Sequence, residues 1–598
     1  MPRPPVETAT RVLSTLYVVL VVLFAIHVVW VAIDTHYTIP TRDDWRLLDG
    51  MFSSPTLEWI LTDQVGHRVP VTLSLMYFDY TIFGGHMHLL VLASLLWTGV
   101  AVAILARAPR FRDLSLDPLA WTAVAFACFL FFWAVSRHDL GWGMHQGTLL
   151  SAMFAVVSVA ALGTAARRKL DNGIPGTLPL LTAVAAAIGA SFSSGIGFAC
   201  WAGLFTVSLL IPLSARAIAA LWVCAAVVLV VYMTGLENSG FKAPKDAYLW
   251  KLANVPGRLF EFAIAYVGAP AATLFSDAPK AFAYNFARFA GAIGFAGYVT
   301  LVLYLVIRRD KMTPLHVFAV GLPSIALAGG FMVGLNRLNW PNYPSMALRY
   351  STWSTLFWIG LVFAIPSLRR RPNFRPGWPS LFGIVLFVGL SVLLLPEFRA
   401  QRGAQAAHKS YNAYISTMHL LGIRWDPMSK NSIRPLPDRT YRIVERLRRD
   451  RRSFFGEHRA SWVGSSIADD FELADDDRCT GGVSWTQLTL TRDDPVLRVT
   501  GWAIDHKRET PIEHILVADG AGIVRGLGIY VRRDADLGEI QLPLEDFPWA
   551  GFLGPPSDRG PYRAFGVLNG SLICDLKLSA KAIRWPGYQH RKLRAKPL

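Results

Sequence analysis

The sequence predicts a polytopic α-helical membrane domain with about eleven crossings, followed by a C-terminal periplasmic mixed domain that ends in a β-sandwich. Apolar runs of about 17–23 residues, long enough for a helix to cross a bilayer, recur from Met1 to Pro396 and then stop. Hydrophobic residues make up 53% of the chain, above the roughly 45–50% of soluble domains. We therefore expect a membrane domain at 1–396, a helical periplasmic linker at 397–470 and a periplasmic β-sandwich at 471–598.

The expected crossings are the longest apolar runs, at about 12–33, 87–106, 118–136, 147–166, 176–192, 195–214, 217–235, 289–307, 315–335, 352–368 and 379–396. The first run is too long for a signal peptide and has no A-x-A site after it, so we expect a retained helix. Basic clusters lie beside these runs, as the positive-inside rule describes. With Arg3 and Arg11 inside, those clusters all fall on the inner side, and the odd count places Glu397–Leu598 in the periplasm of a bacterial inner-membrane protein.

The same clusters explain the formal net charge of +17 without a nucleic-acid partner. They are Arg107/Arg110/Arg112, Arg167/Arg168/Lys169, Arg308/Arg309/Lys311 and Arg369/Arg370/Arg371/Arg375. Membrane lipids are therefore the expected partners of this charge. The apolar segment Val69–Gly85 is short and carries Asp79, and if it crossed, Arg107 would fall outside. We predict that it is a re-entrant or interface-lying helix.

The polar loops that could carry chemistry all fall on the outer side: Asp34–Arg68, Arg137–Gln146, Glu237–Arg288 and Asn336–Tyr350. The first contains IPTRDDWRLLDG directly after the first helix. Asp43 and Asp44 there would lie near the membrane surface, where a carboxylate is costly unless it has a partner or a function. One of them can deprotonate an acceptor hydroxyl, or the pair can hold a divalent cation such as Mg²⁺ or Mn²⁺. The alternative is an N-cap for a helix that starts near Trp45.

The other outer loops supply candidate substrate-binding residues. His67 and Arg68 precede the interface helix, and such an arginine can bind a lipid phosphate or extend to the interface. His138 lies in RHDLGWGMHQ, where substrate hydrogen bonding is favoured over a metal site because the spacing matches no metal motif. The remaining candidates are Lys242, Lys245, Arg337, Tyr343 and Arg349. Positive-inside logic does not explain outer arginines, so Arg349 is a candidate ligand for a phosphate leaving group.

The soluble part begins with two expected helices, Arg399–Gly422 and Arg439–Phe455, and continues with strands from about Cys479. Outside the cytoplasm, Cys479 and Cys574 can form a disulfide between the first and last strands; two buried thiols are the alternative. Trp485 and Trp502 are either platforms for sugar stacking or core aromatics.

This layout resembles GT-C glycosyltransferases, a superfamily that includes protein O-mannosyltransferases, the lipid A aminoarabinose transferase and oligosaccharyltransferases. The resemblance covers about 1–400 and rests on the acidic pair after the first helix, the juxtamembrane helix and the number of crossings. Where the aminoarabinose and mannosyl enzymes have Asp-Glu, this chain has Asp43-Asp44. The first position matches the family's catalytic Asp, which favours Asp43 as the base. The C-terminal sandwich, with its GWAID stretch, does not match the soluble domains of those enzymes.

The resemblance implies an inverting transferase that moves a sugar from a polyprenyl-phosphate donor to a hydroxyl on a glycan, lipid or protein. It leaves the metal requirement open. Two other functions compete with this one: a flippase or transporter of lipid-linked glycans, and an enzyme of the O-antigen polymerase or ligase type that relies on the Glu237–Arg288 loop. A third is a membrane-anchored binding or assembly factor. The sequence shows no internal repeat of the kind that many transporters have.

Overall fold

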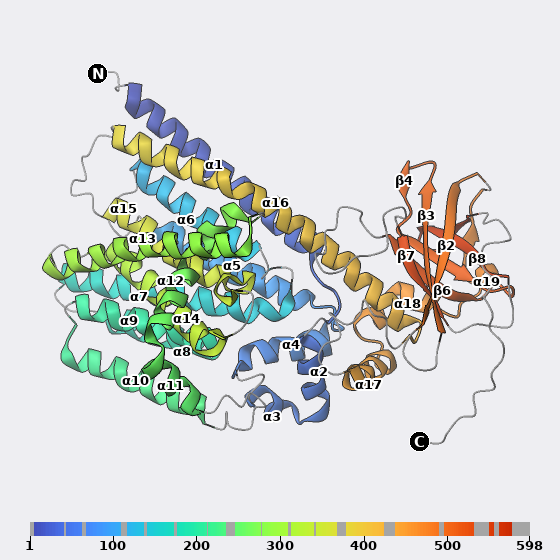
Figure 1. Ribbon diagram of the computed structural model, residues 1–598, viewed down its shortest axis with the longest axis horizontal. Coiled ribbons are helices and arrows are strands. Elements are labelled where there is room, and N and C mark those ends of the chain that lie inside the picture. The colour runs from blue at the N-terminus through green and yellow to red at the C-terminus, as the bar shows by residue number, and fades with distance from the viewer. Residues whose placement is uncertain are drawn as a thin grey trace. The chain divides into compact units, whose positions relative to one another are not determined.

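The structure is a computed structural model in which the chain forms helices over most of its length and strands near its end (Figure 1). It describes residues 5–40, 43–62, 67–108, 117–136, 140, 142–172, 176–211, 213–234, 245–276, 278–308, 313–339, 343–367, 378–423, 437–475, 477–489, 495–530, 549–554 and 561–576. The chain divides into two compact units. Unit 1 comprises Met1–His36, Ser54–Asp79 and His88–Arg402. Unit 2 comprises Tyr37–Ser53, Tyr80–Met87 and Gly403–Leu598.

Nine helices in the described part of the chain are long and apolar enough to cross a membrane, as expected of a multi-pass membrane protein. They are α1 (Pro5–Thr35), α5 (His88–Arg107), α6 (Pro118–Ser136), α7 (Gln146–Asn172), α10 (Ala215–Met233), α12 (Pro256–Ala272), α13 (Lys280–Ile307), α14 (Pro314–Arg337) and α16 (Trp378–Leu420). Three apolar helices between these are shorter, with 12 to 17 residues: α8 (Thr177–Ser191), α9 (Ala199–Leu210) and α15 (Ser351–Ser367).

Contacts along α1 show the direction of its neighbours. Ser14 donates a hydrogen bond to the carbonyl of Pro118 at the start of α6, and Phe24 lies 4.8 Å from Phe129 further along that helix. Tyr17 and Ser391 share a hydrogen bond of 2.6 Å, and Phe24 also lies 5.0 Å from Phe398. In each pair of helices, a contact further along α1 involves a residue further along the partner helix. α1, α6 and the part of α16 up to Arg402 therefore run in the same direction.

The segment that we predicted to be a loop, Glu237–Arg288, is largely helical, and this part of the prediction was wrong. It contains α11 (Lys245–Asn254), α12 and the start of α13. A β-carbon on Gly268 would lie 1.8 Å from the carbonyl oxygen of Ala287, and one on Gly291 would lie 2.0 Å from that of Ile264. The glycines therefore allow α12 and α13 to approach closely, as small residues do between membrane helices. Glu261 and Pro270 interrupt the apolar run of α12 and concealed it in the sequence.

Short helices follow α1. They are α2 (Asp43–Ser53), which belongs to unit 2, and α3 (Thr56–Leu61) and α4 (Pro70–Ile82), which begin in unit 1. At 13 residues α4 is too short to cross a bilayer upright. Buried Asp79, 1% exposed, accepts a hydrogen bond of 2.9 Å from the backbone amide of Leu89 in the first turn of α5. The carboxylate that argued against a crossing thus stabilises a helix N-terminus.

Unit 2 contains one hydrogen-bonded sheet with the strand order β1-β9-β8-β5-β6-β7-β3-β2, with β4 beside β3. Its strands are β1 (Glu472–Leu473), β2 (Cys479–Thr489), β3 (Pro495–Asp505), β4 (Thr510–Pro511), β5 (His514–Ala518), β6 (Val524–Tyr530), β7 (Trp549–Leu553), β8 (Arg563–Asn569) and β9 (Leu572–Asp575). All pairs are antiparallel except β1 with β9. The core contains Val499, Ile515, Val517 and Trp549.

A disulfide joins β2 to β9, which lie near opposite ends of this strand order. The Cα atoms of Cys479 and Cys574 are 6.0 Å apart. Neighbouring strands are about 4.8 Å apart, so a flat sheet would separate this pair by several times that distance. The sheet therefore folds back on itself and encloses its core.

Candidate functional site

The acidic pair lies in the first turn of α2 and belongs to unit 2. Asp43 is exposed, whereas Asp44 is buried, with 2% of its surface exposed. Trp45, Leu47 and Leu48 are also buried, so one face of α2 packs into unit 2 and fixes the position of the helix. A carboxylate in a first helical turn is stabilised by the helix dipole. Asp43 is accessible to a substrate, and Asp44 is not.

α17 (Pro437–Arg449) packs against α2 in the same unit. Arg446 donates a hydrogen bond of 3.2 Å to the carbonyl of Phe52, and its guanidinium lies 4.5 Å from the centre of the Phe52 ring. Trp45, next to Asp44, lies 6.0 Å from His419 at the end of α16. These contacts hold the acidic pair's helix beside α17 and the end of α16.

A pocket of about 680 Å³ lies where α17 meets the end of α16. Its lining residues are His419, Gly422, Ile423, Tyr441, Arg442, Val444, Glu445, Arg446, Arg448 and Arg449. The sequence predicts only a helix over Arg439–Phe455 and does not predict the pocket. The available signal was the arginine spacing: positions 442, 446 and 449 fall on one face of a helix.

The segment Tyr80–Met87 is also held against this end of unit 2. The Tyr80 hydroxyl donates a hydrogen bond of 2.9 Å to Asp450, and the amide of Ser453 donates one of 2.6 Å to the carbonyl of Gly84. Burial acts to raise the pKa of Asp450, but the hydrogen bond from Tyr80 and the charges of Arg449 and Arg446 lower it below its ordinary value. Asp450 is therefore ionised at neutral pH and offsets part of the positive charge on α17.

In unit 1, His67 lies beside the turn between α8 and α9, and Arg68 lies beside the end of α10. A β-carbon on Gly195 would lie 2.4 Å from Nδ1 of His67, so only glycine allows this approach. The Arg68 guanidinium donates to the carbonyls of Leu61 and Thr234. Two of its nitrogens are thus bound to backbone, which assigns Arg68 a role in holding the segment together.

Tyr343 and Arg349 lie in the segment before α15. Tyr343 has a positive φ of 52°, which is strained for a residue with a side chain, and its ring stacks on Tyr284 at 4.7 Å. Tyr284 in turn donates a hydrogen bond of 3.2 Å to Glu261. The Arg349 guanidinium lies 5.1 Å from the ring centre of Tyr350, and its buried Nε has no hydrogen-bond partner among the described residues. The Nε–H of Arg349 is therefore an unsatisfied donor of this segment.

Of the other predicted residues, Arg337 lies in the last turn of α14. His138 and Lys242 lie outside the described residues, as does the side chain of Lys245 at the start of α11. Trp502 is 38% exposed, whereas the side chain of Trp485 falls in a part that is not described.

The predicted residues are divided between the two units. Asp43 and Asp44 belong to unit 2, and His67, Arg68, Arg337, Tyr343 and Arg349 belong to unit 1. Within the described ranges, no three His, Cys, Asp or Glu side chains are grouped so that they could hold a metal ion. Asp43 and Asp44 remain the predicted ligands if a divalent cation takes part.

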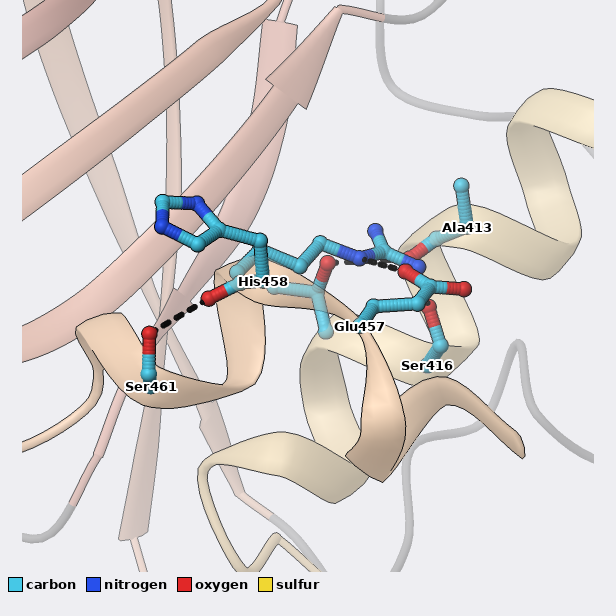
Figure 2. Close-up of polar contacts among 7 residues, drawn as sticks. Ala413, Ser416, Glu457, His458 and Ser461 are labelled. Carbon is cyan, nitrogen blue, oxygen red and sulfur yellow. Dashed lines mark hydrogen bonds and ion pairs between the residues drawn. The ribbon is translucent and has the colours of Figure 1, made fainter. Parts of the chain in front are cut away.

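The part of α16 that belongs to unit 2, Gly403–Leu420, is here called the α16 extension. A polar network fixes α18 (His458–Trp462) to this extension (Figure 2). Arg459 donates hydrogen bonds to Glu457 and, at 2.8 Å, to the hydroxyl of Ser416 in α16. Trp462, at the other end of α18, lies 5.6 Å from His514 in β5. α18 thus connects the α16 extension to the sheet within unit 2, and the network has a structural role.

This arrangement predicts that unit 2 loses stability in acid. Burial, reinforced by the charge of Arg459, lowers the pKa of His514 to about 4 from its ordinary value of 6.5. The unfolded chain therefore binds a proton between these two values when the folded chain does not. Above pH 6.5 the burial of neutral His514 has no proton-linked cost. As the pH drops toward 4, the free energy of unfolding of unit 2 falls by on the order of 2–3 kcal/mol.

Hydrogen exchange of β5 and β6 peptides in the full-length protein at pH 7, 5.5 and 4 measures this loss, after correction for the intrinsic exchange rate. His514→Gln should flatten the pH dependence, whereas His506→Gln, at an exposed position, should leave it unchanged. Equal pH dependence in the wild-type protein and His514→Gln would show that another group is responsible.

Comparisons with protein-family models, curated proteins and solved structures give no match for this chain.

Proposed function

We propose that this protein is a membrane glycosyltransferase that moves a sugar from a polyprenyl-phosphate donor to a hydroxyl acceptor in the cell envelope. The observation that carries the proposal is the acidic pair: an exposed Asp43 and a buried Asp44 begin a fixed helix directly after a long apolar helix. A carboxylate in this position can reach a lipid-linked substrate at the bilayer surface. Exposed Asp43 is available for proton transfer, whereas buried Asp44 belongs to the face that fixes the helix.

The proposal includes eleven crossings in the bacterial inner membrane, with unit 2 in the periplasm. The common direction of α1, α6 and α16 supports an odd number of crossings between Met1 and Arg402. In this arrangement α12 does not cross fully, because a crossing there would make the number of crossings from α1 to α16 even, against the common direction of these two helices. A sheet that folds back on itself, tied by the Cys479–Cys574 disulfide, supports the β-sandwich.

In the proposed reaction, Asp43 accepts the proton of the acceptor hydroxyl as the oxygen attacks the anomeric carbon. The bond from that carbon to the phosphate oxygen breaks, and polyprenyl phosphate leaves with the bonding electron pair. One displacement inverts the anomeric carbon.

The test uses the full-length protein in nanodiscs with a radiolabelled polyprenyl-phosphate sugar and an envelope extract as acceptor. Release of polyprenyl phosphate together with labelled acceptor is the expected result. Movement of intact donor across a liposome membrane, with no bond cleavage, would show that the protein is a flippase and not a transferase. Activity that requires Arg258 and not the acidic pair would favour a polymerase or ligase.

A further inference from the structure

The arginine pocket of unit 2 carries more positive charge than its own contacts neutralise. Its lining includes four arginines and one glutamate, a balance of +3 with His419 neutral. Asp450 lies 3.6 Å from Arg446 and 3.5 Å from Arg449 and reduces this excess to +2. Like charges within two turns of one helix repel one another. An anion would relieve this repulsion.

The arginines differ in how far the protein already uses them. Arg446 is bonded to Phe52, and Arg448 donates a hydrogen bond of 2.8 Å to the carbonyl of His419 and lies 3.5 Å from Glu445. Arg442 is exposed and, within the described part of the chain, has no hydrogen bond or ion pair. The bonded arginines shape the wall, and Arg442 is available for a ligand.

His419 supplies a second and independent sign of a ligand. It is 1% exposed, and its ring is held between Phe454 at 6.1 Å and Trp45 at 6.0 Å. Its Nε2 is buried and has no hydrogen-bond partner among the described residues. A buried polar atom without a partner costs roughly 1–3 kcal/mol, so it calls for an explanation. A ligand oxygen in the pocket would provide the missing partner.

We propose that this pocket binds a phosphate group of a glycan or lipid. Arginine guanidinium groups match the geometry of phosphate oxygens, and a dianionic phosphate balances an excess of two positive charges better than a single carboxylate does. The volume of about 680 Å³ lies within the range of small-molecule sites and admits a sugar beside the phosphate. Binding at this site does not require the proposed transfer reaction.

The test measures binding of inorganic phosphate and of glucose 1-phosphate to the full-length protein in zwitterionic nanodiscs by isothermal titration. Arg442→Gln should weaken binding by roughly tenfold or more. His419→Phe keeps an aromatic ring but removes the nitrogens, and it should weaken glucose 1-phosphate binding. The matched control is Arg508→Gln, an exposed arginine of the same unit that is not part of the pocket lining.

Nanodiscs that contain phosphatidic acid distinguish the two sources of phosphate. Loss of soluble phosphate binding in these discs identifies a lipid headgroup as the ligand, and retained binding identifies a soluble phosphorylated glycan. Equal affinity in wild-type protein and Arg442→Gln, or no phosphate binding to either, would overturn the proposal. Because no step of the assay involves sugar transfer, either result leaves the proposed function to be tested separately.

Discussion

Replacing Asp43 with asparagine is expected to lower the rate of sugar transfer by about 10²–10⁴-fold, the usual contribution of a general base. The substitution keeps the shape of the side chain and removes its ability to accept a proton. Because Asp43 is exposed, the protein should fold and insert as before. Steady-state kinetics with the lipid-linked donor should show the loss mainly in kcat, with an unchanged thermal unfolding profile.

Two neighbouring carboxylates provide controls. Asp44 is buried, so Asp44→Asn should lower the free energy of unfolding of unit 2 by about 1–3 kcal/mol in addition to any effect on rate. Asp49→Asn changes a half-buried carboxylate on the same helix and should retain activity. Full activity of both Asp43→Asn and Asp44→Asn would remove the acidic pair from the mechanism.

Removing the disulfide of unit 2 is expected to lower its free energy of unfolding by about 3–5 kcal/mol. Cys479 and Cys574 are 95 residues apart in sequence, so the bond restricts a long loop of the unfolded chain. The variant Cys479→Ser/Cys574→Ser should expose the sheet to limited proteolysis at lower urea concentrations than the wild-type protein. Strong reductant should give the same shift.

The control for the disulfide is Cys224→Ser, because Cys224 is a free and partly exposed cysteine of unit 1. This variant should behave like the wild-type protein with and without reductant. If the double serine variant resisted proteolysis as well as the wild-type protein does, the disulfide would not stabilise unit 2.

Eight of the nine long apolar helices of the described chain could be predicted, because length and apolarity alone identify a candidate crossing. The two soluble cysteines could be paired because their strands lie at the ends of the sheet region. The helix α2 was foreseeable as well, since two aspartates before Trp45 are typical of a helix N-terminus. Each of these signals is local, or depends on only two positions.

The remaining features depend on contacts between distant segments. The pocket is lined by His419 of α16 and by arginines of α17. Trp45 of α2, far earlier in the sequence, contacts His419. No local sequence pattern predicts that these three helices come together. Similarly, α12 was missed because Gly268 and Gly291 bury it against α13 despite its weak apolar run. Asp43 and Asp44 are also adjacent residues of the same type, so the sequence does not predict which of them is exposed. Packing of α2 buries Asp44 and leaves Asp43 exposed.

The central claim is that the acidic helix and unit 2 lie outside the cytoplasm, where a lipid-linked sugar can meet them. Labelling of variants with one added cysteine, in a protein that lacks the free Cys128, Cys200 and Cys224 but keeps the disulfide, tests it most directly when a membrane-impermeant maleimide is applied to intact cells. Three exposed positions are suitable: Glu58→Cys before α4, Lys507→Cys in unit 2 and Arg308→Cys at the end of α13. Glu58→Cys and Lys507→Cys should be labelled in intact cells, and Arg308→Cys only after permeabilisation. The opposite pattern would place the acidic pair in the cytoplasm and contradict the proposed reaction.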